Sequence, residues 1–166
     1  MTNKRLRTKR TAPAKGPDAI VLLRSDHRAV ALLLDQLKNT RSTTRKKTIV
    51  RQICLALTVH AQLEEEIFYP AVSAALKDRE LLRKALLEQA TLKTLIAEVQ
   101  EIEPTSEDYG AQVKRVLDYL RQHVDEQNEI FPKTRSSGIN MGMLGAQLAS
   151  RKQELLTASG DFGGWD

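Results

Sequence analysis

The chain has 166 residues, which is enough for a single domain to bury an apolar core without disulfide cross-links. Five prolines, eight glycines and an aromatic content of 4%, in a chain rich in Leu, Ala, Glu and Lys, favour an all-helical protein. The net charge of +5 arises from the first 16 residues, which hold six Lys or Arg and no acid, so the remainder is close to neutral. The single cysteine, Cys54, excludes an internal disulfide framework and fits a reducing compartment.

Residues 1–16 come first in chain order and form a basic tail. A tail of this composition is expected to be disordered, and its simplest role is to keep the protein soluble. Weak binding to nucleic acid or another acidic surface is the alternative, although no aromatic residue interleaves the charges to stack on bases. The tail lacks the apolar stretch of a secretory signal, and no segment has 18 consecutive apolar residues, so we expect a cytoplasmic protein without a membrane span.

Two long helices are expected next, over about 18–39 and 44–76, because apolar residues recur there at helical spacing. His27 lies in the apolar stripe of the first helix and His60 in that of the second. Pro70 is expected to kink the second helix or to end its regular part. The inner stripe of this second helix is expected to comprise Ile53, Leu57, His60, Glu64, Ile67 and Ala71.

Two further long helices are expected over about 79–103 and 107–133, followed by a shorter helix over about 143–157 on the outside. Gln89 lies on the inner stripe of the third helix, and His123 on that of the fourth. Polar residues that precede helical patterns are the expected N-caps. They are Asp18, Asp78 and Ser106.

Four long helices joined by short loops predict an all-α fold, an antiparallel up-down-up-down four-helix bundle with a short extra C-terminal helix. We expect the bundle to occupy residues 17–157, between the basic tail 1–16 and a flexible C-terminal tail over 158–166. Each of the four helices brings a polar side chain to a similar height along the bundle. The sequence therefore predicts one polar layer inside an apolar core, and buried imidazoles from several helices indicate a metal site.

An internal echo relates the second and fourth helices. In HAQLEEEIFYP (60–70) and HVDEQNEIFP (123–132), Glu-Ile-Phe begins six residues after the histidine. The two helices are therefore expected to be related by an approximate twofold axis. The echo aligns Glu64 with Gln127, each four residues after its histidine, and this spacing places both side chains on one helix face.

The pattern resembles the hemerythrin-like, or HHE cation-binding, family over roughly residues 17–156. The segments that carry the resemblance are LLRSDHRAVALLLDQL, HAQLEEEIFYP, LLEQATLKTLIAEV and HVDEQNEIFPK, in that order. The resemblance implies a four-helix bundle that holds two bridged non-haem irons. It also implies binding of dioxygen or nitric oxide, sensing of oxygen or iron, or a role in stress responses.

Carried over by position, the resemblance implies His27, His60, Glu64 and His123 as metal ligands. It also places Gln89 and Gln127 at ligand positions, where the family has histidine and carboxylate respectively. Glutamine is a much poorer iron ligand than imidazole or carboxylate. Glu126, which lies beside the stripe of the fourth helix, is the expected replacement carboxylate, and Glu88 and Glu65 are further candidates.

The replacement of two expected ligands by Gln89 and Gln127 favours one retained metal site. His27, His60 and Glu64 form a two-histidine-one-carboxylate set, which suits mononuclear iron. A second metal would keep only His123 and glutamines. The sequence therefore predicts an iron-binding protein with an incomplete diiron site, whose small ligands are dioxygen, nitric oxide or iron.

Two other interpretations remain open at this stage. In the first, the glutamine amides hydrogen-bond the histidines and form a neutral polar network, and a metal-free bundle acts as an interaction or regulatory module. In the second, the protein is an enzyme that degrades peroxide at iron. We rank the metal-binding protein first, the metal-free module second and the enzyme third.

Overall fold

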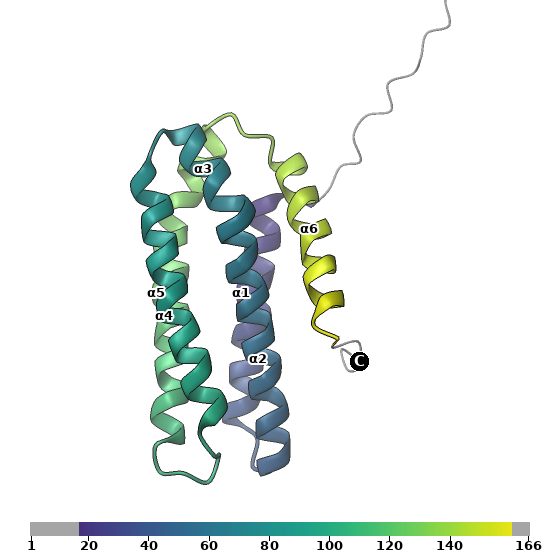
Figure 1. Ribbon diagram of the computed structural model, residues 1–166, viewed down its shortest axis with the longest axis vertical. Helices are drawn as coiled ribbons and strands as arrows, with labels where there is room; N and C mark the ends of the chain where they lie inside the picture. Colours follow the sequence, from purple (N-terminus) through teal and green to yellow (C-terminus); the bar gives the residue numbers. More distant parts are fainter. Residues whose placement is uncertain (1–16, 161–166) are drawn as a thin grey trace, which may run out of the picture.

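The computed structural model describes residues 17–160, and the regular structure in this range is helical throughout. Four long helical segments alternate in direction to form a bundle, and a further helix lies beside it (Figure 1). This arrangement confirms the predicted fold. The elements are α1 (Ala19–Lys38), α2 (Thr43–Leu63), the π-helical η1 (Glu64–Phe68), α3 (Tyr69–Leu76), α4 (Arg79–Glu101), α5 (Tyr109–Ser136) and α6 (Met141–Ala158).

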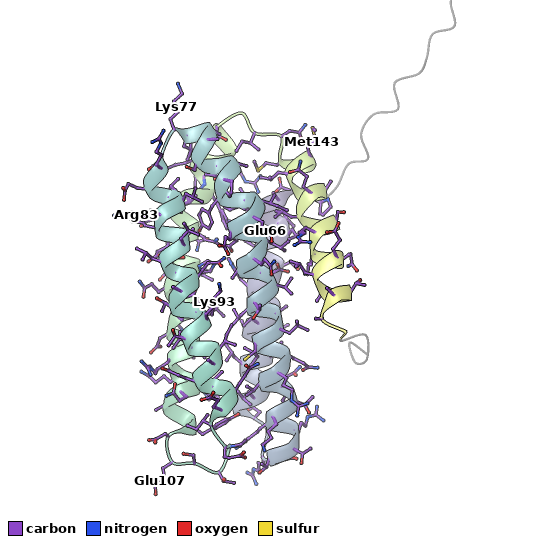
Figure 2. The ribbon with its side chains drawn as sticks, viewed as in Figure 1. Glu66, Lys77, Arg83, Lys93, Glu107 and Met143 are labelled. Atoms are coloured by element: carbon purple, nitrogen blue, oxygen red, sulfur yellow. The ribbon has the colours of Figure 1, made fainter. Side chains whose placement is uncertain are left out.

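The expected tails lie largely outside the described residues. All of the basic segment 1–16 is outside them, and so are residues 161–166 of the C-terminal tail. In the described range, no helix is long and apolar enough to cross a membrane. Lys77, in the turn before α4, and Glu107, in the loop before α5, lie at opposite ends of the bundle (Figure 2).

The helix starts follow the predicted caps in two cases of three. The side chain of Asp18 accepts hydrogen bonds from the first turn of α1, and that of Asp78 accepts one from α4. The prediction for Ser106 is wrong, because α5 begins at Tyr109 and follows Asp108. The Ser106 hydroxyl instead accepts from the Asp108 amide at 3.3 Å and closes a turn before the helix.

The second long helix changes register at η1, directly before Pro70. The amide of Tyr69 donates to the carbonyl of Glu64, five residues earlier, so this turn is wider than an α-helical turn. Phe68 and Val72 are consequently fully buried, whereas Ile67 and Ala71 are only half-buried. Ile67 and Ala71, expected on the inner stripe, therefore pack at the edge of the second apolar cluster and not at its centre.

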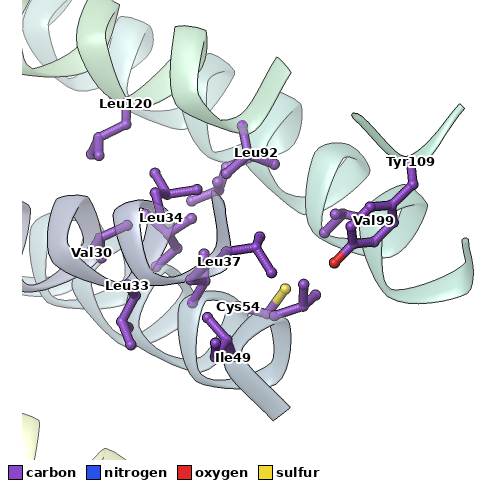
Figure 3. Packing of buried hydrophobic residues seen from close by; sticks show 14 residues of the cluster. Val30, Leu33, Leu34, Leu37, Ile49, Cys54, Leu92, Val99, Tyr109 and Leu120 are labelled. Atoms are coloured by element: carbon purple, nitrogen blue, oxygen red, sulfur yellow. The ribbon is translucent and has the colours of Figure 1, made fainter. Parts of the chain in front are cut away.

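Two apolar clusters make up the core, one in each half of the bundle. Figure 3 shows the first cluster, in which Val30 of α1 packs with residues of α2, α4 and α5. The second cluster contains Leu23 of α1 and Phe68, which meets Phe131 edge to face at a centroid distance of 5.9 Å. Along α1, His27 falls between Leu23 and Val30. The predicted polar layer therefore separates the two clusters.

Candidate metal centre

Four buried side chains from three long helical segments converge in this layer. His27 comes from α1, His60 from α2, Glu64 from the first position of η1, and His123 from α5. Their exposed fractions are 7%, 5%, 3% and 7% respectively. One ligating atom of each lies within 4.8 Å of those of the others, so together they can hold a metal ion.

The Nε2 atoms of the three imidazoles face one another and the Glu64 carboxylate. The Nε2 atoms of His27 and His60 are 3.1 Å apart. Oε1 of Glu64 lies 3.2 Å from Nε2 of His123 and also contacts Nε2 of His60. The structure therefore places His123 in the same set as the other three residues. The predicted division of the ligands into two separate half-sites does not match this geometry.

The opposite ring nitrogens face outward to carboxylates. Nδ1 of His60 lies 3.1 Å from Oδ2 of Asp26, and Nδ1 of His123 lies 3.3 Å from Oε2 of Glu88. A carboxylate that accepts the Nδ1 proton fixes the ring orientation and directs the Nε2 lone pair inward. Outer carboxylates of this kind accompany metal-binding histidines in many proteins.

The metal-free cluster carries protons on two of its imidazoles. Burial lowers the pKa of His60, but the Glu64 carboxylate and the hydrogen bond to Asp26 outweigh burial and raise it to about 9. The pKa of His123 is likewise raised to about 10 by Glu64 and Glu88, against the effect of burial. Burial and the charges of His60 and His123 lower the pKa of His27 to about 3, so His27 is neutral.

Glu64 remains ionised between these imidazoles. Burial alone would raise the pKa of its carboxyl group, but the charges of His60 and His123 and their hydrogen bonds hold the pKa well below its usual value. At neutral pH the cluster therefore contains one carboxylate, two imidazolium rings and one neutral ring. A cation that binds here replaces protons.

Gln89 and Gln127 present amide groups where the resemblance places ligands. Nε2 of Gln89 donates to the carbonyl of Ala61. Nε2 of Gln127 donates to Oε2 of Glu64 at 2.7 Å and to the hydroxyl of Tyr69 at 3.1 Å. Oε1 of Gln127 is buried and has no hydrogen-bond partner among the described residues. An unpaired buried oxygen is costly, and a nearby cation would satisfy it.

Glu126 lies outside the converging set. Its carboxylate accepts a hydrogen bond from Gln122 at 3.0 Å on the exposed side of α5. Glu88, the other candidate carboxylate, contacts the outer nitrogen of His123 and does not face the converging atoms.

Tyr119 stacks on the His123 ring at a centroid distance of 6.0 Å.

The sequence reasoning missed Asp26 and Lys152. Asp26 directly precedes His27 and so falls beside the apolar stripe, where a carboxylate is unremarkable. Its only local signal is the pair Asp-His in an otherwise apolar helix face. Lys152 Nζ donates to Oδ1 of Asp26 at 2.6 Å. The two residues are 126 positions apart in the sequence, so no local pattern predicts their contact.

The profile of the hemerythrin HHE cation binding domain matches residues 18–134, which span all four long segments of the bundle. The chain belongs to the hemerythrin HHE family. A solved structure of an HHE cation-binding-domain-containing protein from Mycobacterium kansasii is similar to this HHE domain, with a TM-score of 0.74. The two are 19% identical, and the match covers 86% of this chain and 89% of that one.

A curated relative shares the matched region. This chain is 26% identical over 117 residues to a protein described as a DNA nickase from Nostoc sp.. The match covers 70% of this chain but 33% of the relative. The chain thus spans about a third of the length of that protein.

The residues of this HHE domain fit one metal ion better than two. Bonds of about 2.1 Å place two ligand atoms on one ion at most about 4.2 Å apart, so the four atoms need only small side-chain rotations. A cavity of about 10 Å³ beside them, lined by His60, Glu64 and His123, has room for one atom of water size. A second ion would have to be held largely by the neutral amides of Gln89 and Gln127, which are weak ligands.

Proposed function

We propose that His27, His60, Glu64 and His123 bind one non-haem iron ion, and that the protein uses this ion to bind or sense dioxygen, nitric oxide or iron. The observation that supports the proposal is the convergence of three Nε2 atoms on one carboxylate, with outer carboxylates on two of the Nδ1 atoms. Imidazole and carboxylate together suit iron, and the family is a cation-binding one.

The burial of the cluster limits the ligands to small ones. Side chains that are 3–7% exposed admit a diatomic molecule or a single ion, but they keep a duplex phosphodiester away from the metal. The proposal therefore does not extend the nickase activity of the Nostoc relative to this chain. Supercoiled plasmid incubated with the iron-loaded protein should stay supercoiled, as in a metal-free control.

Iron stoichiometry tests the proposal directly. Ferrous iron is added without oxygen, unbound metal is removed, and iron and zinc are measured per chain. We expect about one iron per chain, and strong loss in His60→Ala and Glu64→Gln, because each substitution removes a ligand. Glu129→Gln is the matched control and should keep its iron, since Glu129 is exposed on α5 and lies outside the converging set.

Different outcomes contradict different parts of the proposal. Two irons per chain would contradict the single site, and zinc retained in preference to iron would contradict the metal identity. No metal under any loading condition would contradict metal binding itself. A change in the visible spectrum of the ferrous protein on addition of nitric oxide would support ligand binding at the ion.

A metal-free interaction module is the second candidate, and the hydrogen-bond network supports it. Gln127 bonds Glu64, and Glu64 in turn bonds His123, so the cluster has partners without a metal. The unpaired oxygen of Gln127 and the convergence of three imidazole nitrogens with one carboxylate favour the metal-bound form. The response of the Tm to ferrous iron distinguishes the two candidates.

A further inference from the structure

Helix α6 lies beyond the residues that the family profile matches, yet it is seated tightly on the bundle. It lies beside α1 and α2 (Figure 1). Its Leu144 and Leu148 are buried in the second apolar cluster. Gly145 lies so close to the chain before α1 that an added Cβ would overlap the Pro17 carbonyl. It would also come within 2.9 Å of the Ala19 amide nitrogen. The position of α6 along α1 is therefore closely defined.

This seating brings Lys152 of α6 to the outer carboxylate of the metal cluster. Nζ of Lys152 donates to Oδ1 of Asp26 at 2.6 Å, while Oδ2 of Asp26 lies 3.1 Å from Nδ1 of His60. The Asp26 side chain is only 11% exposed, so these contacts replace most of its hydration. The two oxygens of Asp26 thus have one partner each, and the contacts form a chain from α6 to a metal-facing imidazole.

We propose that Lys152 is a positioning residue of the metal centre, which orients His60 through Asp26. This inference rests on the proposed metal-binding function. A carboxylate with a free oxygen can rotate or turn toward solvent, but the ammonium group holds Oδ1 and leaves Oδ2 to accept the Nδ1 proton of His60. That hydrogen bond directs Nε2 of His60 toward the other ligands.

Lys152 also supplies the opposite charge for the nearly buried carboxylate of Asp26, which helps to keep that carboxylate in place beside His60. Helix α6 thereby becomes part of the metal centre, although it lies outside the matched domain.

Arg151 provides a matched control within α6. Its guanidinium pairs with Glu66 of η1 at 2.8 Å and with Glu154 at 2.9 Å. Glu66, labelled in Figure 2, is exposed on the side of the bundle where α6 lies. Arg151 therefore helps to dock α6 without touching Asp26. Lys152→Met and Arg151→Met both remove a tether of α6, but only the first removes the contact to Asp26.

The first measurement is ferrous-iron affinity of the full chain, determined by competition with a chromophoric chelator. We expect Lys152→Met to weaken binding about tenfold, the lower end of the effect of losing an outer partner. Lys152→Arg should restore the affinity because it restores the donor, and Arg151→Met should change it less than about twofold. In an Asp26→Asn background, Lys152→Met should add no further loss.

Two results would overturn the positioning role. One is equal loss in Lys152→Met and Arg151→Met, which would show that docking of α6 alone matters. The other is an undiminished effect of Lys152→Met in the Asp26→Asn background, which would show that Lys152 does not act through Asp26.

A second measurement does not depend on metal. In protein labelled with ¹⁵N-histidine, the Nδ1 proton of His60 should be protected from exchange with solvent in the metal-free wild type and in Lys152→Arg. It should exchange rapidly in Lys152→Met. If the wild type binds no metal but this contrast appears, the proposed function fails and the positioning role stands. If metal binds and the proton is equally protected in all variants, the positioning role fails and the proposed function stands.

Discussion

Protons and a metal ion compete for the same nitrogen atoms in this cluster. The pKa of His60 is raised to about 9 and that of His123 to about 10, so at neutral pH both rings carry the proton that a metal must displace. His27, whose pKa is lowered to about 3, needs to lose none. The affinity of the site therefore depends on pH through two of its four ligands.

We expect the metal affinity to rise as the pH is raised from neutral toward 9. Each displaced proton changes the apparent affinity about tenfold per pH unit while its ring is protonated, so two rings give a steep dependence. Chelator competition with cobalt, which tolerates mild alkali, measures the slope. Glu129→Gln, an exposed substitution on the same helix as His123, should leave the slope unchanged. An affinity independent of pH would contradict the assignment of the protons.

The same shifts determine how the metal-free protein responds to alkali. Because the folded pKa values of His60 and His123 lie above the unfolded value of about 6.5, their stabilisation is complete below that pH. It is lost as the pH rises through about 9 to 10. We expect the free energy of unfolding, measured by urea denaturation of chelator-treated protein, to fall over this range. The free energy of unfolding of Glu64→Gln should fall less over the same range, since Glu64 raises both pKa values. An equal fall in the wild type and the variant would contradict this mechanism.

At the scale of the element, η1 decides which side chains face the core after Glu64. Buried positions on this segment recur every four residues, which is longer than the 3.6-residue period of an α-helix. They are His60, Glu64, Phe68 and Val72. The wider turn at η1 absorbs the difference. It keeps Glu64 in the metal cluster while Phe68 enters the second apolar cluster.

We expect Phe68→Ala to destabilise the protein far more than Ile67→Ala. Phe68 is completely buried against Phe131, and loss of such a ring costs about 3–5 kcal/mol in the free energy of unfolding. Ile67 is half-buried, so its truncation removes less apolar contact. In a regular α-helix Ile67 would face the core in place of Phe68, and Ile67→Ala would then be the more destabilising substitution. Urea denaturation of the two variants measures the difference, and similar losses would contradict the register at η1.

Helix α6 is the other element whose seating has consequences for the site. We expect Gly145→Ala to displace α6, because the new Cβ would overlap the Pro17 carbonyl. Lys152 would then leave Asp26, so iron affinity should fall as it does in Lys152→Met. Gly110→Ala is the matched control, since a Cβ at Gly110 meets nothing within 4 Å. Thermal melting measures the loss of stability, and chelator competition measures the iron affinity. A Gly145→Ala variant that is destabilised but keeps its iron affinity would contradict the link between α6 and the metal centre.

At the scale of the whole molecule, local periodicity predicts the bundle and most of its polar layer. On α1 the repeat of Leu23, His27 and Val30 gives both the helix and its buried face, because an amphipathic α-helix has one fixed period. The echo between the second and fourth helices likewise pairs Phe68 with Phe131, and their rings do meet.

Periodicity fails where the helix changes its period or where a contact spans the chain. The inward turn of Phe68 depends on the π-helical turn, whose wider spacing no α-helical template contains. The contact between Lys152 and Asp26 depends on how α6 docks, which is a tertiary property. The orientation of Glu126 is also not predictable from the sequence. A position beside the apolar stripe of α5 allows the side chain to face either the cluster or the surface, and in the structure it binds Gln122.

The thermal stability of the whole molecule separates the metal centre from the metal-free module. An ion that binds only the folded state must stabilise it, by about 2.7 kcal/mol at a free concentration one hundred times Kd. We therefore expect ferrous iron, added without oxygen, to raise the Tm of the wild type and a chelator to reverse the rise. Glu64→Gln should show little rise, because it lacks the only carboxylate in the converging set of described residues. A wild-type Tm that is indifferent to iron would favour the metal-free module, in which the bond between Gln127 and Glu64 is the final state of the cluster.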